Sequence, residues 1–497
     1  MRASCNTTYQ QPLRPAHDRN GGRIDRILGA LGGREVLVVG LGESGREAAL
    51  FLLSKGARIR CTDSATFASL QERKRDLERL GARVELGHHT EEFCRGCEMV
   101  VVSPGVHPGS LPLVWADARG VPVISEIELA FRFCRSRVVA ITGTNGKTTT
   151  CELTNEILRE GGVTTATAGN IGLPLVRKVA EEEAPEVLVV EVSSFQLERI
   201  HWFRPFISAV LNITEDHLDR YDSFRDYVEA KVRIAENQGG GDFLIVNEEL
   251  KHFFPVGRGS DSPRVLSVGR SLDADIRLRD GRVTSRVCGE ERCYEVDAHW
   301  LLRGEHNLEN VGVAIGVAEI LGVGEDAVYA ALSQFRGPKH RIEFVDEVCG
   351  VEFYDDSKGT NVDAVVKALE SFARPVILIA GGRDKGGDYA PLRRAATRPL
   401  PGRPEGRVKL AVLMGEAKEK LLSSLAGAVA AVVADGMEAA VEIAFRHAEA
   451  GDVVLLSPAC SSFDMFADYK ERGQAFQRKV KELRQELQER RRNHEAA

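Results

Sequence analysis

The stretch of the sequence best suited to chemistry is a glycine loop that ends in Lys-Thr: Gly143-Thr144-Asn145-Gly146-Lys147-Thr148-Thr149. It follows an apolar run at 138–141 and precedes a predicted helix over 151–160. Such a loop surrounds phosphate oxygens with backbone N–H groups, while its lysine meets the β- and γ-phosphates and its threonine hydroxyl ligates Mg²⁺. The general motif would need glycine at position 141, which is isoleucine. The sequence therefore predicts a triphosphate site of a shorter type.

Three further side chains with catalytic chemistry follow this loop. Glu191 comes near the end of a predicted buried strand, His217 lies in an acidic loop after the next strand, and Lys231 lies on a predicted helix over 224–236. Taken alone, each is more often structural than catalytic. Their order behind a triphosphate loop favours a shared magnesium site, because carboxylates at strand ends commonly ligate magnesium beside such loops.

A second glycine loop, Gly40-Leu41-Gly42-Glu43-Ser44-Gly45, follows a predicted strand at 35–39. The next predicted strand ends at Asp63, which Ser64 follows, and a third strand ends in Ser103-Pro104-Gly105. This pattern is typical of dinucleotide binding, with the pyrophosphate on the loop and the acid on a ribose. The same turn can hold the pyrophosphate of a UDP-sugar, so both ligand classes remain open at this point.

Length and composition are typical of a multidomain globular enzyme. The chain has 497 residues, enough for three domains of roughly 150 residues each. Its net charge of −7 disfavours a nucleic-acid surface along the whole chain. No apolar segment reaches the ~18–20 residues of a membrane span, and ten scattered cysteines are typical of a reducing compartment. We expect a cytoplasmic, monomeric enzyme with no nucleic-acid partner and no membrane span.

Alternating predicted strands and helices indicate an α/β fold of three domains. The domain over 34–135 and the domain over 338–497 are predicted to be Rossmann-like. The domain over 136–337 is predicted to be a P-loop ATPase-like parallel sheet. Residues 1–33 are rich in arginine, proline and glycine, and we interpret them as a disordered N-terminal extension.

Three smaller segments carry predictions of their own. Short β-like runs over 261–298 predict an antiparallel flap, and the proline- and glycine-rich residues 398–407 predict a flexible surface loop. The chain ends in an amphipathic helix, with Phe476, Val480 and Leu483 on the face that we expect to pack on the core.

Eight motifs in a fixed order make the chain similar to one enzyme family: TGTNGKTTT, GNIG, EVSSFQLE, NITEDHLDRY with AKVRI downstream, GEHNLEN, PKHR, DDSKGTN and SPACSSFD. From Glu35 to about Phe476, the chain resembles the Mur ligases of peptidoglycan synthesis. EVSSFQLE, HLDRY and SPACSSFD favour, within that family, the ligases that add D-glutamate. The Asp-Asn-Pro-Arg tetrapeptide expected of a diaminopimelate-adding ligase does not occur.

The resemblance implies ATP-dependent ligation of D-glutamate to UDP-N-acetylmuramoyl-L-alanine through an acyl phosphate, with two Mg²⁺ ions and a carbamylated Lys231. The implied catalytic residues are Lys147, Glu191, His217 and Lys231, and the implied metal ligands are Thr148, Glu191, His217 and Lys231. The implied ATP contacts are Gly143, Thr144, Asn145, Gly146, Lys147, Thr148, Thr149, Asn307, Asn310, Arg341 and Asp356. The implied UDP-substrate contacts are Ser44, Asp63, Ser64, Ser103, Gly105, Asn170 and His217. The implied acceptor contacts are Lys358, Thr360, Lys385, Ser462, Phe463 and Tyr469, although relatives often carry phenylalanine at the last position.

Two alternatives compete with this interpretation. Another Mur-type ligase, or a folylpolyglutamate ligase, would use the same ATP chemistry on a different acceptor. An NAD-dependent oxidoreductase would account for the loop at 40–45 but would leave Lys147, Glu191, His217 and Lys231 without a function.

Overall fold

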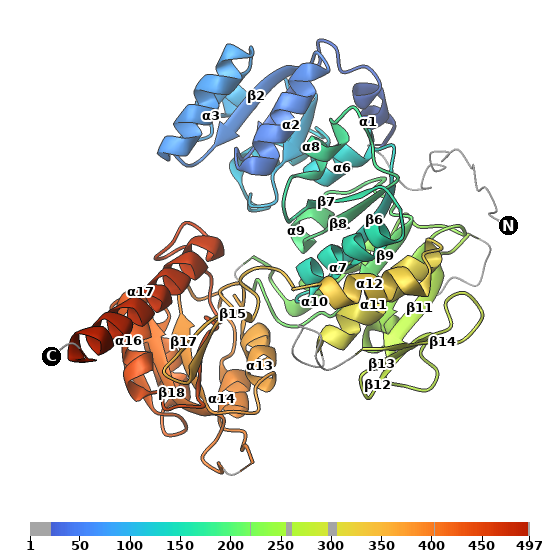
Figure 1. Cartoon of the computed structure of the whole chain (residues 1–497). Coiled ribbons are helices and arrows are strands. Elements are labelled where there is room, and N and C mark those ends of the chain that lie inside the picture. Colours follow the sequence, from blue (N-terminus) through green and yellow to red (C-terminus); the bar gives the residue numbers. More distant parts are fainter. Residues whose placement is uncertain (1–20, 219, 255–260, 297–305, 402, 496–497) are drawn as a thin grey trace.

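The computed structural model of the chain describes residues 21–218, 220–254, 261–296, 306–401 and 403–495. Its strands form three sheets of five, nine and six strands, with helices packed against them. Figure 1 shows these sheets in three lobes that follow the order of the sequence. The predicted α/β fold of three domains is confirmed. Among the described helices, none has both the length and the apolar composition that crossing a membrane requires.

The N-terminal sheet has the strand order β3-β2-β1-β4-β5, and all of its strand pairs are parallel. Its strands are β1 (Glu35–Val39), β2 (Arg58–Asp63), β3 (Arg83–Leu86), β4 (Met99–Val102) and β5 (Val123–Ser125). Its helices are α2 (Glu43–Ser54), α3 (Ala68–Arg79), α4 (Glu91–Cys94), α5 (Leu111–Ala118) and α6 (Glu126–Phe131). The three strands predicted from buried apolar runs are present. The short edge strands β3 and β5 were not predicted, because four and three residues are too few for a clear hydrophobic pattern.

The prediction that residues 1–33 are disordered is wrong from residue 21 onward. Helix α1 spans Gly21–Leu28. Its side chains Ile24 and Ile27 are 0% and 3% exposed and belong to the hydrophobic core of the N-terminal domain. The sequence did not indicate this helix, because its few apolar residues lie among arginines and glycines. Residues 1–20 lie outside the described part of the chain.

The central sheet has the strand order β14-β13-β12-β11-β10-β9-β6-β8-β7. The strands are β6 (Arg137–Thr142), β7 (Thr165–Gly169), β8 (Val187–Glu191), β9 (Ile207–Val210), β10 (Phe243–Asn247), β11 (Arg264–Gly269), β12 (Ile276–Arg279), β13 (Arg282–Ser285) and β14 (Arg292–Glu295). The helices are α7 (Lys147–Glu160), α8 (Leu175–Val179), α9 (Ser194–Leu197), α10 (Phe224–Val232), α11 (His306–Ile320) and α12 (Glu325–Gln334), with 3₁₀ turns η1 (Arg233–Ala235) and η2 (Glu248–Phe253).

The predicted antiparallel flap over 261–298 is corrected by the strand pairing. Strands β10, β11 and β12 are parallel neighbours, and only β13 and β14 run antiparallel to the strand before them. The segment therefore extends the central sheet instead of forming a separate flap. Its apolar side chains, including Ile276 and Tyr294, are buried in the same core as α7 and α11.

The C-terminal sheet has the strand order β15-β16-β20-β17-β18-β19, and only β15 is antiparallel to its neighbour. Its strands are β15 (Glu343–Val348), β16 (Val351–Asp355), β17 (Val376–Gly381), β18 (Val408–Met414), β19 (Ala431–Val433) and β20 (Val453–Leu456). Its helices are α13 (Val362–Glu370), α14 (Ala390–Ala396), α15 (Lys418–Leu425), α16 (Met437–His447) and α17 (Tyr469–Glu495). Buried apolar runs in the sequence predict strands here at 351–355, 376–380, 410–414, 431–434 and 453–456, and all five are present. Phe476, Val480 and Leu483 of α17 are buried as expected.

The described residues of 398–407 form an irregular loop, as predicted, with a backbone pair inside the loop and a hydrogen bond to the rest of the domain. Leu400 and Arg403 pair through their backbones, and Nη1 of the buried Arg407 donates to the carbonyl of Leu369 at 2.7 Å.

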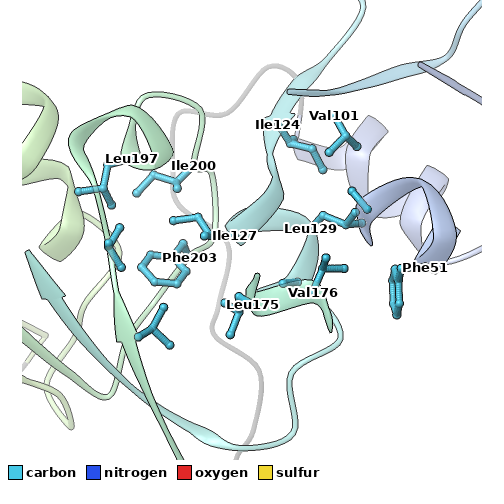
Figure 2. Packing of buried hydrophobic residues seen from close by; sticks show 14 of the residues in the cluster. Phe51, Val101, Ile124, Ile127, Leu129, Leu175, Val176, Leu197, Ile200 and Phe203 are labelled. Atoms are coloured by element: carbon cyan, nitrogen blue, oxygen red, sulfur yellow. The ribbon is translucent and has the colours of Figure 1, made fainter. Parts of the chain in front are cut away.

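The N-terminal and central domains share one hydrophobic core. Figure 2 shows Ile124, Ile127 and Leu129, at and after the end of the N-terminal sheet, close to Leu175 and Phe203 of the central domain. The carboxylate of Glu128, 0% exposed, accepts the backbone N–H groups of residues 201–203 at 2.9–3.1 Å. This buried junction holds the two sheets in a defined relation, since large apolar interfaces do not slide freely.

Candidate active site

The glycine loop joins β6 to α7 at the carboxyl edge of the central sheet, where the neighbouring strands β8 and β9 also end. Gly146 has a φ of +86°, and a Cβ there would lie 2.3 Å from Oδ1 of Asn310, so glycine is required. The backbone N–H groups of Thr144 and Asn145 donate to the carbonyl and the side-chain oxygen of Asn212, each at 2.8 Å. The segment after β9 therefore shapes the loop.

Lys147 is folded back onto its own loop. Its Nζ donates to the carbonyls of Gly143 and Thr144 at 2.8 and 2.9 Å. Burial lowers the pKa of Lys147, and the carboxylates of Glu191 and Asp216 oppose that shift. Since its hydrogen-bond partners are neutral carbonyls, the ammonium can exchange them for phosphate oxygens, with which it forms stronger, charge-assisted bonds.

The buried residues Thr148 and Glu191 form a polar cluster beside the loop with the exposed Asn170. The hydroxyl of Thr148 donates to Oε2 of Glu191 at 2.7 Å, and Nδ2 of Asn170 donates to Oε1 at 2.8 Å. From the C-terminal domain, Nζ of Lys358 donates to the same hydroxyl of Thr148. A hydroxyl and a carboxylate are ligands that Mg²⁺ prefers, and the ammonium beside them is evidence that this cluster attracts a cation.

Lys231 projects from α10 to the back of the glycine loop and is 1% exposed. Its Nζ donates to the carbonyl of Gly143 at 2.9 Å and lies 4.7 Å from the ring centroid of Tyr227. Burial, reinforced by the charge of Lys147, lowers the pKa of Lys231 well below the ordinary lysine value. This shift makes the neutral amine, which is the form that reacts as a nucleophile, easier to reach than in an exposed lysine.

His217 lies in the loop after β9, with a left-handed φ of 57°. Its ring packs edge-on against Phe195 at a centroid distance of 4.7 Å. Burial lowers the pKa of His217 to about 3, although Asp216, whose Oδ2 lies 3.6 Å from Nε2, acts in the opposite direction. The imidazole is thus neutral at physiological pH and keeps a lone pair for a metal or a hydrogen bond.

Asp216 joins the central domain to the C-terminal domain. Its carboxylate accepts Nζ of Lys385 at 3.2 Å and Nδ2 of Asn361 at 3.1 Å. Burial acts to raise the pKa of Asp216, but Lys385 and His217 outweigh it and hold the pKa at about 2. A second link of this kind runs from Nδ2 of Asn145 to Oδ2 of Asp363 at 2.7 Å.

The expected nucleotide contacts of both domains lie around one small cavity of about 20 Å³. Its lining includes Asn145, Gly146, Thr149, Asn307, Asn310, Arg341 and Asp356. Burial raises the pKa of Asp356 to about 6, with Nη1 of Arg341 3.8 Å from its Oδ1. Within the described residues that oxygen accepts no hydrogen bond. A buried acceptor without a donor suits the hydroxyl of a ribose.

The expected acceptor residues are only partly gathered. Nζ of Lys358 lies 5.5 Å from the ring centroid of Tyr469, and burial lowers the pKa of this lysine to about 8. Lys385 instead pairs with Asp216. The side chain of Ser462 is buried, Thr360 is half-buried and Phe463 is 63% exposed. The structure thus places the two lysines in different polar clusters.

The second glycine loop is stabilised by two residues that we expected to face a ligand. Asp63 accepts the backbone N–H groups of Leu41 at 2.7 Å and Ala65 at 2.9 Å, and the hydroxyl of Ser103 donates to the carbonyl of Gly40 at 2.8 Å. Both side chains therefore shape the loop. Ser64 and Gly105 are exposed and Ser44 is half-buried at its rim.

Several polar residues of the site were not singled out from the sequence. They are Asn212, Asp216, Tyr227, Asn361 and Asp363. Asn212 and Asp216 share the NITEDH motif with His217, and Asn361 ends the DDSKGTN motif, so a polar side chain just after a strand was the available signal. The pairing of Asn145 with Asp363 left no signal, because the two residues are 218 positions apart.

Three family models match the chain along most of its length. Residues 34–125 match the MurD-like N-terminal domain of Mur ligases, residues 141–318 the Mur ligase middle domain, and residues 340–460 the Mur ligase glutamate ligase domain. The chain is 45% identical over 452 residues to the UDP-N-acetylmuramoylalanine–D-glutamate ligase of Geotalea uraniireducens, covering 90% of this chain and 98% of that protein. The corresponding enzyme of Geobacter metallireducens is 45% identical over 454 residues, with 91% and 98% coverage.

Solved structures show the same fold at much lower identity. The ligase MurC of Thermotoga maritima superposes with a TM-score of 0.55 at 18% identity, covering 90% of this chain and 99% of that chain. MurF of the same organism, in complex with ADP, gives a TM-score of 0.57 at 16% identity, covering 92% and 97%. The chain belongs to the Mur ligase family and, within it, to the UDP-N-acetylmuramoylalanine–D-glutamate ligases.

Proposed function

We propose that the protein joins D-glutamate to UDP-N-acetylmuramoyl-L-alanine, the ligation that the names of its relatives state for those enzymes, and that it forms ADP and phosphate as it does so. The observation that carries this proposal most directly is the cluster of Thr148, Glu191 and Asn170 beside the glycine loop. It brings a magnesium-type ligand pair and an amide donor to the point where a γ-phosphate on this loop would lie. An NAD-dependent oxidoreductase has no use for this arrangement.

ATP would bind across the central and C-terminal domains. The N–H groups of the glycine loop, residues 143–149, would hold the phosphates together with Lys147. Asn307, Asn310, Arg341 and Asp356 would hold the nucleoside. This assignment is supported by the shared cavity, and its small volume implies that the two domains separate to admit the nucleotide.

Thr148 and Glu191 would hold one Mg²⁺ ion, and His217 with Lys231 would support a second. When bound, the ions neutralise negative charge on the phosphates. A carbamylated Lys231 is supported by its burial and lowered pKa, because a neutral amine can form a C–N bond to CO₂ and, on releasing one proton to solvent, become a carbamate anion. That anion would attract magnesium, which an ammonium would repel.

The UDP-substrate would lie between the second glycine loop and the glycine loop of the central domain. Ser44, Asp63, Ser64, Ser103 and Gly105 would define the UDP end, and Asn170 and His217 the alanyl end. At the alanyl end, Asn170 and His217 would orient the carboxylate. Lys147 would stabilise charge as that carboxylate attacks the γ-phosphate.

The amine of D-glutamate would attack the acyl phosphate, and phosphate would leave. Lys358, Thr360, Lys385, Ser462, Phe463 and Tyr469 would form the acceptor pocket. Lysines and hydroxyls at these positions suit a substrate with two carboxylates, because charge-assisted hydrogen bonds are strong in a partly dry site. For this to happen, Lys358 and Lys385 must leave Thr148 and Asp216, their partners in the present structure.

The decisive experiment is ADP release with a panel of acceptors: D-glutamate, L-glutamate, D-aspartate, lysine, diaminopimelate and L-alanine. Each is tested with and without UDP-N-acetylmuramoyl-L-alanine, and Lys147→Ala serves as the inactive control. We expect turnover that requires both the UDP-substrate and D-glutamate. Preference for another acceptor would place the protein with a sister ligase, and turnover with none would refute the proposal. A monomeric state and a cytoplasmic location stay predictions, testable by scattering and by fractionation.

A further inference from the structure

Arg220 follows the His217 loop and is held in one orientation. Its side chain is 10% exposed, and its guanidinium forms a two-point ion pair with Glu198, Nε to Oε1 at 3.0 Å and Nη2 to Oε2 at 2.7 Å. Glu198 also accepts the hydroxyl of Tyr221 at 2.8 Å. A planar guanidinium held at two points has little freedom to rotate, unlike a lysine ammonium.

The third nitrogen of Arg220 reaches into the N-terminal domain. Its Nη1 donates to the carbonyl of Val106 at 2.9 Å. Val106 closes the turn that begins at Ser103, with its N–H donating to the Ser103 carbonyl at 3.1 Å. That turn packs so closely on Gly40 that a Cβ there would lie 2.7 Å from Cγ2 of Val106. Arg220 therefore holds the turn that supports the second glycine loop.

The other side of the Arg220 guanidinium contacts the aromatic ring that packs against His217. Its guanidinium carbon lies 4.1 Å from the ring centroid of Phe195, and that ring packs against His217 at 4.7 Å. One side chain thus contacts the turn on the UDP side and the aromatic ring behind His217. The shared core of Figure 2 joins the same two domains through Ile127 and Phe203.

We propose that Arg220 is a positioning residue that sets the spacing between the UDP loop and the alanyl end of the substrate site. This inference rests on the proposed function, in which one substrate spans both domains. Two linked ligand parts bind better than either part alone only when both sites can be reached at once. Arg220 would therefore govern the extra affinity of the whole substrate over UDP, and leave the affinity for UDP itself unchanged.

The test measures dissociation constants of UDP and of UDP-N-acetylmuramoyl-L-alanine by calorimetry, for the full-length wild type and for Arg220→Lys. We expect the variant to bind UDP within about twofold of the wild type and the whole substrate about tenfold or more weakly. KM for the UDP-substrate should rise while KM for ATP stays unchanged. Glu198→Gln weakens the ion pair that orients Arg220. It should also raise the dissociation constant of the whole substrate relative to that of UDP, by a smaller factor than Arg220→Lys.

Arg199→Lys is the matched control. Arg199 also crosses between these domains, to Asp117 at 3.0 and 3.3 Å, but this pair is exposed and contacts neither substrate loop. We expect both affinities to stay at the wild-type values in this variant. If Arg220→Lys does not fold, Glu198→Gln decides the question alone.

Each outcome has a separate meaning. Equal loss of both affinities in Arg220→Lys would overturn the inference, because a damaged loop or a direct phosphate contact would act on UDP as well. Unchanged affinities in both Arg220→Lys and Glu198→Gln would also overturn it. If the wild type binds the whole substrate no better than UDP, the proposed division of the substrate between two domains fails instead.

Discussion

Replacing Lys231 by methionine should leave the fold as stable as before, or more stable, while it abolishes turnover. The amine is buried and makes one hydrogen bond, to the carbonyl of Gly143. Nζ of Lys147 donates to the same carbonyl at 2.8 Å, so removing the amine leaves no carbonyl unpaired. Methionine fills a similar volume with apolar atoms. Lys231 would thus lower the stability of the fold and yet be required for turnover, a combination that is typical of functional sites.

The magnitude follows from proton linkage. The folded-state pKa of Lys231 lies well below the ordinary value of 10.5, so between those two values the unfolded chain binds one proton more than the folded chain. Stability therefore rises with pH in this window, by at most ~1.4 kcal/mol per pH unit for one proton. For a domain of ~200 residues, this corresponds to a melting temperature that rises by roughly 3–6 °C per pH unit. Lys231→Met removes this pH-dependent contribution to the free energy of unfolding.

The assay records melting temperatures of the ligand-free protein from pH 7 to pH 9.5 in CO₂-depleted buffer, for the wild type, Lys231→Met and the surface variant Lys178→Met. The wild type and Lys178→Met should share one slope, and Lys231→Met should have a shallower slope. Its melting temperature at pH 7 should equal or exceed that of the wild type. ADP release by Lys231→Met and by Lys231→Ala should fall about 10²-fold or more, because charge stabilisation of the transferred phosphate is lost.

Two results would refute this reasoning. Equal slopes in the wild type and Lys231→Met would mean that the pKa of Lys231 is not lowered in the folded protein. Full activity of Lys231→Ala would mean that position 231 carries no anion needed for turnover. Partial rescue of Lys231→Ala by acetate or formate, which can occupy the vacated position, would support the carbamate directly.

Three further predictions concern the rest of the site. Lys147→Ala should lower kcat by about 10²-fold or more while the protein still folds, since the lysine stabilises charge on the γ-phosphate; near-normal kcat would contradict the loop assignment. Small-angle scattering should show a smaller radius of gyration with ATP analogue and UDP-substrate than without, because the central and C-terminal domains, which separate to admit the nucleotide, must then close on it from both sides; identical profiles would argue against domain motion. Ser462→Ala should raise KM for D-glutamate more than KM for ATP, because its hydroxyl would meet only the acceptor; equal changes would remove it from the acceptor pocket.

Much of the fold and of the site was predictable from the sequence because the relevant signals are local. The strand, loop and helix around Lys147 occupy about twenty consecutive residues, and buried apolar runs mark β1, β6, β8 and β16. Polar residues at or just after strand ends, such as Glu191 and Asn212, meet at one edge because parallel strands end together. The positions of these residues relative to the strands, which can be read from the sequence, thus determined which side chains can lie near the glycine loop.

The partners of these side chains were decided by the tertiary structure. Lys358 reaches Thr148 across 210 positions, and Lys385 reaches Asp216 across 169, although an acceptor pocket was the expectation for both lysines. The burial of Lys231 also depends on packing, since its helix leaves it free to face solvent or core. The extension of the central sheet by β12–β14 was missed for the same reason. Sequence patterns record which residues prefer burial, but contacts between distant segments depend on how whole domains pack, and no local pattern encodes that choice.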